Sequence, residues 1–365
     1  MKFVELTEAE FRKTEFGCEN FLQSVEMYQR YRDLGREAYL VGVRRAEGKK
    51  ELLATGLILG RNWHFGKKTY RVPGGWLMDY DGKERREILA FLTKKAKDFC
   101  QEKDGIVLEI SPNVVSQTRD SDNQVISGPE HLAVKRELQD LGYKYLGEYE
   151  QSKWIYVKDL GMETPEEMLK RFRTTHRQLI QKSRREGVRV RELGADELGI
   201  LKKIAAEAGA RHGFQDPAME YYQSMKRAFG DKVRFVVAEL PKESLREQDR
   251  EKYAGEGEYI PLAASMFIED NQEMVYLYSG SRRDLQRYNG AYAIQWWALN
   301  EALVKGIKRY NFYGVKPVAG NGVYSFKQGF RGRVEELLGT FALPIGVLGK
   351  FYVARLKSVE YGEVH

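Results

Sequence analysis

The sequence predicts an α/β (α+β) protein made of two similar halves. At 365 residues the chain is too long for one typical hydrophobic core and suits two domains. Its 42% hydrophobic and 12% aromatic residues suffice to fill two cores, which excludes a disordered chain. The third observation is that the order of elements repeats, because each half reads as three strands, a helix and a fourth strand.

The first half contains four strand-like segments and one helical segment. Alternating or continuous apolar residues predict strands at 38–43, 52–59 and 69–72. Between 84 and 101 apolar residues recur at helical spacing, which predicts an amphipathic helix. A further apolar run at 105–110 predicts the fourth strand.

The second half repeats this order. Apolar runs predict strands at 233–238, 262–268 and 274–278. Helical spacing predicts a helix at 291–305, and a strand follows at 309–313. The halves share the order of their elements rather than sequence identity.

A hairpin followed by a β-α-β unit is the element order of the GCN5-type N-acetyltransferase fold. The sequence therefore predicts two tandem acetyltransferase-like domains, at 1–155 and 156–345, followed by a C-terminal helix or tail at 346–365. Two polar segments, 113–129 and 242–258, interrupt the pattern and are predicted to be exposed loops.

A basic helix is predicted at the start of the second domain. Thr164 and Glu167 form a capping box and Gly187 ends the pattern, so we expect one continuous helix over about 165–186. Residues 168–191 hold nine Lys or Arg and a single acidic residue, which attracts polyanions. The ordinary interpretation is a solvent-exposed charged helix face, and the more specific one is a surface that binds nucleic-acid phosphates.

The sequence offers little for metal, thiol or membrane chemistry. No run of about 18 apolar residues appears, and the start lacks a secretory signal, so we expect neither a membrane span nor export. Cys18 and Cys100 are the two cysteines, and we expect both to be reduced. The five histidines lack metal-ligand spacing, which argues against a zinc site and a Cys–His nucleophile.

The segment 274–330 carries most of the chemistry that the sequence suggests. A strand that feeds a helix through a basic, glycine-containing loop forms an anion-binding corner, because free N–H groups at the helix start face the loop. Arg287 and Gly290 match half of the pyrophosphate loop of acetyltransferases, but the bulky Tyr292 stands where a small residue is needed. This argues against coenzyme A, and an ordinary basic turn is the alternative.

Lys327 is the catalytic candidate, with its neighbour Phe326. We expect Lys327 in a loop after the strand at 309–313, where its ammonium can stabilise the oxyanion formed when an amine attacks an ester carbonyl. The Phe326 carbonyl can orient that amine, and a solvated loop lysine is the alternative. Tyr276 and Tyr278 alternate along a strand and should face the same side, where they either pack a core or contact a ligand.

Several motifs together resemble a known family. The residues that carry the resemblance are 276–281, 289–296, 306–315 and 326–330, with 21–24, 187–190 and the pair Tyr221-Tyr222. They resemble the FemA/FemX/MurM family of bacterial aminoacyltransferases, which use aminoacyl-tRNA to build peptidoglycan cross-bridges. The resemblance covers nearly the whole chain.

The resemblance implies transfer of an amino acid from aminoacyl-tRNA to the stem peptide of lipid II or of UDP-MurNAc-pentapeptide. It assigns stabilisation of the tetrahedral intermediate to Lys327 and orientation of the amine to the Phe326 carbonyl. It also implies that Tyr221, Tyr276 and Tyr278 contact the cell-wall substrate. Neither a metal nor a bound cofactor is implied, because the co-substrate tRNA ester is already activated.

Three departures from the family pattern concern the acceptor. Ser111 stands where an aspartate often precedes proline, so a carboxylate is not available there. The family's lysine for the substrate phosphate falls near Tyr31 and Arg32, and Asp216 replaces an arginine before the tyrosine pair. These changes weaken recognition of a soluble nucleotide precursor and favour lipid II.

A fourth departure concerns the tRNA. Many members insert a long helical arm in the second domain, and 242–258 is too short for it, so we expect a short form of the fold. The basic helix is then expected to carry more of the tRNA contact, through Lys182, Arg184 and Arg185.

Together these features predict a cytoplasmic, tRNA-dependent aminoacyltransferase of peptidoglycan synthesis. Its expected partners are aminoacyl-tRNA, the precursor and, peripherally, the inner membrane face. An acetyl-CoA-dependent N-acyltransferase and a non-catalytic RNA-binding protein on the same fold are the alternatives. The transferred amino acid, its position in the bridge, the state of the acceptor and the oligomeric state stay open at this point.

Overall fold

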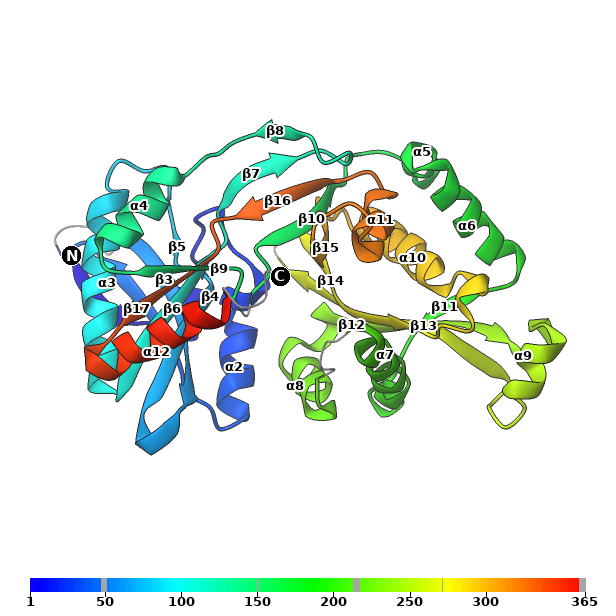
Figure 1. Cartoon of the computed structure of the whole chain (residues 1–365), viewed down its shortest axis with the longest axis horizontal. Coiled ribbons are helices and arrows are strands. Elements are labelled where there is room, and N and C mark those ends of the chain that lie inside the picture. Colours follow the sequence, from blue (N-terminus) through cyan, green and yellow to red (C-terminus); the bar gives the residue numbers. More distant parts are fainter. Residues whose placement is uncertain (47–50, 150, 213–216, 271, 361–365) are drawn as a thin grey trace. The chain divides into compact units, whose positions relative to one another are not determined.

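The chain forms two compact units in the computed structural model (Figure 1), which describes residues 1–46, 51–149, 151–212, 217–270 and 272–360. Unit 1 consists of Met1–Arg119, Val125–Ile155 and Glu335–His365, and unit 2 of Asp120–Gln124 and Tyr156–Val334.

The C-terminal part of the chain departs from the predicted domain limits. The second domain was expected to extend to residue 345, but Glu335 and the residues after it belong to unit 1. The reason is β17 (Thr340–Pro344), which pairs with β6 and β9 of the first sheet. The predicted tail at 346–365 is the helix α12 (Gly346–Glu360), and residues 361–365 lie outside the described residues.

Unit 1 is built on a sheet with the strand order β1-β2-β3-β4-β6-β17-β9, with β5 paired to β3. Its strands are β1 (Lys2–Glu5), β2 (Ala38–Arg44), β3 (Leu52–Asn62), β4 (Lys68–Gly74), β5 (Leu77–Met78), β6 (Gly105–Pro112), β9 (Lys144–Gly147) and β17. The segment 113–129, predicted to be a loop, instead forms the antiparallel strands β7 (Val115–Arg119) and β8 (Val125–Ser127).

Helices cover both faces of the first sheet. They are α1 (Glu8–Phe11), α2 (Val25–Asp33), α3 (Arg85–Glu102), α4 (Leu132–Asp140) and α12. Leu108 and Phe341 share a core cluster with α3 and α4 residues, whereas their neighbours Val107 and Ala342 pack with Val353 of α12. Because successive strand residues point to opposite faces, α12 lies on the face opposite α3.

The second sheet has nine strands, and seven neighbouring ones follow the order β11-β12-β13-β14-β15-β10-β16. These strands are β10 (Trp154–Asp159), β11 (Arg189–Glu192), β12 (Val233–Pro241), β13 (Tyr259–Asp270), β14 (Glu273–Ser281), β15 (Arg309–Gly314) and β16 (Arg333–Leu337). Figure 1 shows α6 and α10 on one face of this sheet and α7 and α8 on the other.

The helices of unit 2 are α5 (Pro165–Arg171), α6 (Thr174–Arg185), α7 (Leu198–His212), α8 (Met219–Phe229), α9 (Glu247–Lys252), α10 (Gly290–Val304) and α11 (Gly322–Gln328). The charged segment between β12 and β13 contains the six-residue helix α9, so this chain has the short form that was predicted.

The predicted repeat is confirmed at the level of pairing. The elements β2, β3, β4, α3 and β6 of unit 1 correspond in order to β12, β13, β14, α10 and β15 of unit 2. In each unit the first three strands pair antiparallel, and the fourth pairs parallel with the third.

The predicted continuous helix over 165–186 is wrong, because the chain breaks between α5 and α6. Phe172 adopts an extended conformation and packs its buried ring against Phe330, with ring centroids 5.2 Å apart. The N–H of Arg173 donates to the carbonyl of Gly329 over 2.9 Å. The capping box at Thr164 is present, and Gly187 follows α6 with a left-handed φ of 81°, as the end signal predicted.

Candidate active site

The centre of the candidate site is the place where β14 and β15 separate. The two strands pair in parallel over only three positions, the last being Val275 opposite Asn311. Beyond this point β14 continues to Ser281 while it pairs with β13 alone. The last residues of β15 therefore present backbone groups toward partners other than β14.

Lys327 binds to this end of β15. Its Nζ donates to the carbonyl oxygen of Tyr313 over 3.3 Å and also to that of Gly314. Tyr313 has a left-handed φ of 63°, and its N–H donates to Asn311 Oδ1 over 2.7 Å, which fixes a bend at the strand end. The bend therefore occurs at the two residues whose carbonyl groups bind Lys327.

Lys327 lies in a helix, so the prediction of a loop position is wrong. The helix is α11, which the side chain of Asn321 caps by accepting from the Tyr324 N–H. Lys327 is in its last turn and is only 5% exposed. Burial lowers the pKa of Lys327 to about 7, because an ammonium loses hydration when it leaves water. The amine is therefore poised between its charged and neutral forms near neutral pH.

His176 holds the residue next to Lys327, and the sequence analysis gave it no role. Its Nε2 lies 2.8 Å from the carbonyl oxygen of Phe326. Burial lowers the pKa of His176, which favours the neutral ring, and the accepting carbonyl requires that Nε2 carries the proton. The carbonyl that was predicted to orient the amine thus already accepts one hydrogen bond and keeps a second lone pair.

Aromatic side chains enclose His176. Its ring centroid lies 4.9 Å from that of Phe330 and 5.1 Å from that of Tyr292. A Cβ on Gly329 would lie 1.9 Å from the His176 ring, so only glycine fits there. The spacing of His176 and the apolar Ile180, four residues apart on one face of α6, was the signal that could have indicated a buried histidine.

Tyr276 and Tyr278 point to opposite faces of the sheet, so the prediction that they share a side is wrong. A register shift leaves Leu277 without a partner, with Tyr276 opposite Phe267 and Tyr278 opposite Met266. Tyr276 packs against Phe267, with centroids 5.5 Å apart, and hydrogen-bonds Gln295 of α10. A β-bulge cannot be read from residue alternation.

Tyr221 and Tyr278 come together on the other face. Their ring centroids are 5.3 Å apart, and Tyr222 beside them is fully buried. Asp216, the residue that replaces an arginine, lies outside the described residues.

Two arginines of the basic loop before α10 are paired with carboxylates. This pairing argues against the anion-binding corner that the sequence predicted. Arg282 is buried and binds both carboxylate oxygens of Glu256 at 3.0 Å. Arg287 lies 3.5 Å from Asp249. The bulky Tyr292 packs against Phe326 with centroids 5.1 Å apart, so it supports the Lys327 segment.

The predicted tRNA-binding residues lie in the last turn of α6. Lys182 Nζ donates to the Arg287 carbonyl over 3.2 Å, whereas Arg184 and Arg185 are exposed. Arg184 borders an open hollow of about 250 Å³ that Trp296 and Trp297 of α10 also line. Cations at the end of a helix also complement its dipole, so part of this charge is structural.

Tyr31 and Arg32, the predicted substrate contacts of unit 1, lie on α2 and differ in exposure. Tyr31 is buried, its hydroxyl accepts from Arg71 over 2.7 Å, and Arg30 lies over its ring. Arg32 is exposed. Of the two side chains, only Arg32 reaches solvent for a direct contact.

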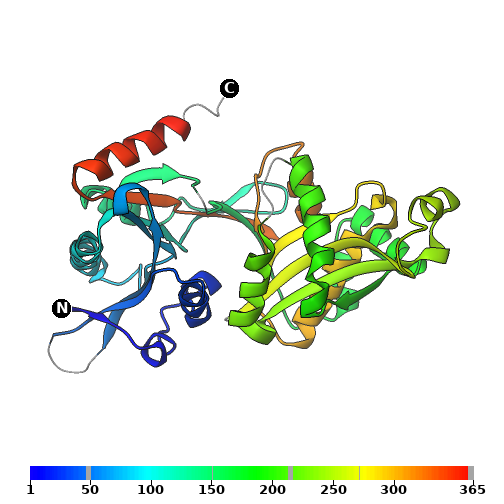
Figure 2. The ribbon, with the colours of Figure 1, turned by 90° about the horizontal axis from the view of Figure 1, so that it is seen from below.

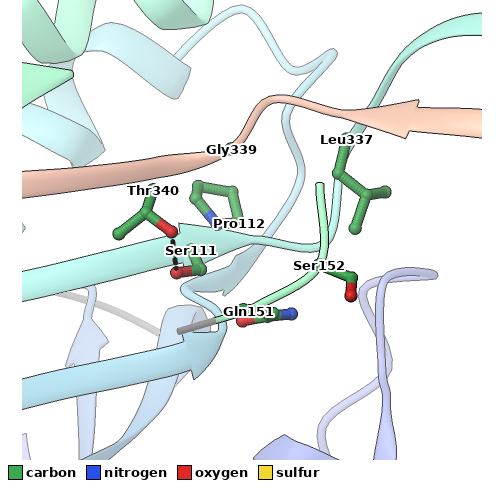
Figure 3. Close-up of a pocket in the computed structure, with 7 residues that line it drawn as sticks. All are labelled: Ser111, Pro112, Gln151, Ser152, Leu337, Gly339 and Thr340. Carbon is green, nitrogen blue, oxygen red and sulfur yellow. Dashed lines mark hydrogen bonds between the residues drawn. The ribbon is translucent and has the colours of Figure 1, made fainter. Parts of the chain in front are cut away.

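Ser111, the residue that stands in place of the expected aspartate, lines a small cavity within unit 1. Figure 3 shows Ser111 and Thr340 facing each other, with their hydroxyl oxygens 2.9 Å apart. The cavity measures about 10 Å³, which is room for one water molecule. Ser111 therefore links β6 to β17 at this point.

Among the described residues, no three His, Cys, Asp or Glu side chains converge as metal ligands. None of the helices in this part of the chain is long and apolar enough to cross a bilayer.

The chain is similar to known proteins over most of its length. Residues 6–254 and 242–356 match the FemAB family. The chain belongs to the FemAB family. Aminoacyltransferase FemB of Staphylococcus epidermidis is 26% identical over 94% of this chain and 95% of its own length.

Solved structures confirm the predicted fold class. The crystal structure of FemX matches with a TM-score of 0.77 at 16% identity, over 98% of this chain and all of the other. A tandem GNAT protein from the clavulanic acid biosynthesis pathway matches with a TM-score of 0.55 at 13% identity, over 94% and 98%. Two GCN5-like domains in tandem, as in these FemAB and GNAT structures, are the architecture of this chain.

Proposed function

We propose that this protein transfers an amino acid from the ester of an aminoacyl-tRNA to an amine of a peptidoglycan stem peptide. Its relative FemB is named an aminoacyltransferase and aligns with nearly the whole chain. The observation that carries the proposal is Lys327, a buried amine held by two backbone carbonyls where β14 and β15 have separated.

The proposed reaction requires oriented reactants and stabilisation of the oxyanion, and it uses no cofactor. The acceptor amine attacks the ester carbon, a C–N bond forms, and the carbonyl oxygen takes up an electron pair. Collapse of this intermediate breaks the C–O bond to the tRNA ribose. The ribose oxygen leaves with that electron pair and takes up the proton that the amine loses, which restores the free hydroxyl. Oriented donors lower the barrier because the oxyanion forms in their field.

Lys327 supplies the charge for this step. Its ammonium has no acidic partner among the hydrogen bonds and ion pairs of the described residues, so its charge can act on an oxyanion. The Phe326 carbonyl, held by His176, offers its second lone pair to an N–H of the acceptor. The two groups are adjacent in the chain, which sets the distance between oxyanion and amine.

The acceptor in this proposal is the lipid-linked precursor. Tyr31 is buried against arginines where the family places a lysine for the substrate phosphate, which argues for a changed phosphate contact. Acetyl-CoA is not expected to bind, because Arg282 and Arg287 pair with Glu256 and Asp249. Isothermal titration with acetyl-CoA, expected to show no heat of binding, tests this point.

Replacement of Lys327 by methionine tests the catalytic assignment. We expect Lys327→Met to lower transfer at least about a hundredfold, as removal of an oxyanion donor does, while the far-UV circular dichroism stays unchanged. Lys158→Met is the matched control, because Lys158 is also buried and donates to a backbone carbonyl, that of Arg331. Equal losses in both variants would refute the assignment, and mass spectrometry of the product measures the transfer.

Charge reversal at the end of α6 tests the tRNA contact. We expect Arg184→Glu with Arg185→Glu to weaken tRNA binding and to flatten its salt dependence, because two phosphate contacts are lost. Lys94→Glu with Lys95→Glu is the control, since these exposed neighbours lie on α3 of unit 1. Filter binding over a salt series measures both, and unchanged binding by the α6 variant contradicts the contact.

A further inference from the structure

Unit 1 carries exposed apolar side chains on two adjacent elements. The exposed fractions along α12 are 68% for Val347, 49% for Leu348 and 71% for Phe351. Phe65, in the turn between β3 and β4, is 97% exposed. Large apolar groups that stand out this far and close together usually mark an interaction surface.

A chain of aromatic contacts joins the two elements. The ring of Tyr352 in α12 lies edge-on to Trp63, with centroids 5.9 Å apart. Trp63 contacts His64 at 5.1 Å, and His64 contacts Phe65 at 6.4 Å. Figure 2 shows α12, in red, beside the light-blue turn between β3 and β4 at the edge of unit 1. We name Phe65, Val347, Leu348 and Phe351 the apolar rim.

The charged side chains that flank the apolar rim on α12 are positive, whereas those of the turn are paired with carboxylates. Lys350 and Arg355 are exposed on α12, and no acidic residue occurs between Gly346 and Arg355. In the turn, Lys67 pairs with Asp104 at 2.7 Å, and Lys68 pairs with Glu37. An apolar helix face flanked by cations is the pattern of a helix that lies in the interface of an anionic bilayer.

We propose that the apolar rim docks unit 1 on the surface of an anionic lipid bilayer. Phe65, Val347 and Phe351 enter the headgroup and acyl boundary, while Lys350 and Arg355 bind lipid phosphates. A bilayer fits better than a protein partner, because the apolar groups protrude from a helix and a turn, and no acidic residue lies between Gly346 and Arg355 among them. The inference goes beyond the proposed function, since docking requires neither tRNA nor the transfer reaction.

Vesicle co-sedimentation of the full-length protein, without tRNA or acceptor, tests docking. We expect binding to vesicles of phosphatidylcholine with phosphatidylglycerol, weaker binding to phosphatidylcholine alone, and a decrease of binding with salt. Phe351→Ser and Phe65→Ser should each weaken binding about tenfold or more, because a phenyl group no longer leaves water. Lys350→Glu should weaken it mainly at low salt.

Matched controls exist elsewhere in the chain. Val347→Ser should weaken vesicle binding, and Val304→Ser should not, although Val304 of unit 2 is 82% exposed. Lys94→Glu, on the opposite face of the first sheet, should also leave binding unchanged. Substitutions at these exposed positions should leave the core intact. An unchanged melting temperature of each variant verifies this.

Three results would overturn the proposal. The first is no binding of the unchanged protein to any vesicle, and the second is equal loss in Val304→Ser and Val347→Ser. The third is a change of molar mass from oligomer to monomer in Phe351→Ser, which would assign the rim to self-association. Transfer to a soluble stem peptide, measured in parallel, should be unaffected by the rim variants, so failure of docking and failure of the proposed function are distinguishable.

Discussion

At the scale of single residues, the candidate site depends on one buried amine and one buried imidazole. The sequence motif indicated Lys327 and Phe326, because the Phe-Lys-x-Gly pattern lies next to a strand and a glycine-rich loop. It could not indicate the effect of burial on the pKa of Lys327, which depends on the packing around α11. It also could not indicate the contact of Phe326 with His176, a residue 150 positions away in the chain. Long-range packing, which no local pattern encodes, determines the chemistry of the motif.

The shifted pKa of Lys327 predicts a pH dependence of stability. The unfolded lysine has a pKa of 10.5 and the folded one about 7. Between these values the unfolded chain holds a proton that the folded protein lacks, so this group makes stability rise with pH from about 7 to about 10.5. Below pH 7 both states are protonated, and the cost of burying the ammonium is at its full value.

Urea unfolding of the wild type and of Lys327→Met at several pH values measures this contribution. The difference in free energy of unfolding, wild type minus variant, should increase with pH by up to about 1.4 kcal/mol per unit within the window. All other titrations are common to both proteins and cancel. A difference that is constant from pH 7 to 10 would show that Lys327 titrates normally.

At the scale of elements, the sequence predicted the regular parts and missed the irregular ones. Apolar spacing located α10 and the strands around it, because burial of one face imposes that spacing. The break at Phe172 was missed because it satisfies a contact with the distant Phe330. The bulge at Leu277 was missed because residue alternation does not reveal a register shift between β13 and β14. These two irregularities are the ones that shape the site, one next to α11 and the other on β14.

The junction of α6 with α11 provides a prediction at this scale. In His176→Phe the aromatic packing is retained but the hydrogen bond to the Phe326 carbonyl is lost. We expect a stability loss of about 1 kcal/mol, the usual value of one such bond. We also expect a fall of kcat by about tenfold or more, because the lysine segment is less well positioned.

Steady-state kinetics separates positioning from binding in this variant. A positioning role predicts a lower kcat with an unchanged KM for aminoacyl-tRNA. His176→Gln, whose amide can also donate to the carbonyl, should recover part of the rate. A rate equal to that of the wild type in His176→Phe would show that the bond is structural only.

At the scale of the whole molecule, the element order allowed both domains to be predicted, because the repeat is visible in each half. The return of the C-terminal segment to unit 1 was not predictable, since β17 has the same apolar pattern wherever it pairs. Strand pairing between residues so far apart in the chain, such as Thr340 with Gly147 and Phe341 with Ile110, leaves no local signal.

Removal of α12 should destabilise unit 1 and leave unit 2 intact. Val353 packs on Ile106, Val107 and Leu146 of the first sheet, and a chain that ends at Ile345 exposes these residues. We expect a loss of several kcal/mol, as buried aliphatic groups contribute about 1.5 to 3 kcal/mol each. Differential scanning calorimetry should show one lowered transition and one unchanged transition, and two unchanged transitions would contradict the packing.

The position of β17 also has a consequence for synthesis on the ribosome. This strand lies between β6 and β9, although it is translated after all of unit 2. Until residues 340–344 leave the exit tunnel, the edges of β6 and β9 that face each other lack their partner. Unit 2 can complete its sheet earlier, so unit 1, whose translation begins first, is completed last. We expect chaperones to protect nascent chains mainly at the unpaired edges of β6 and β9.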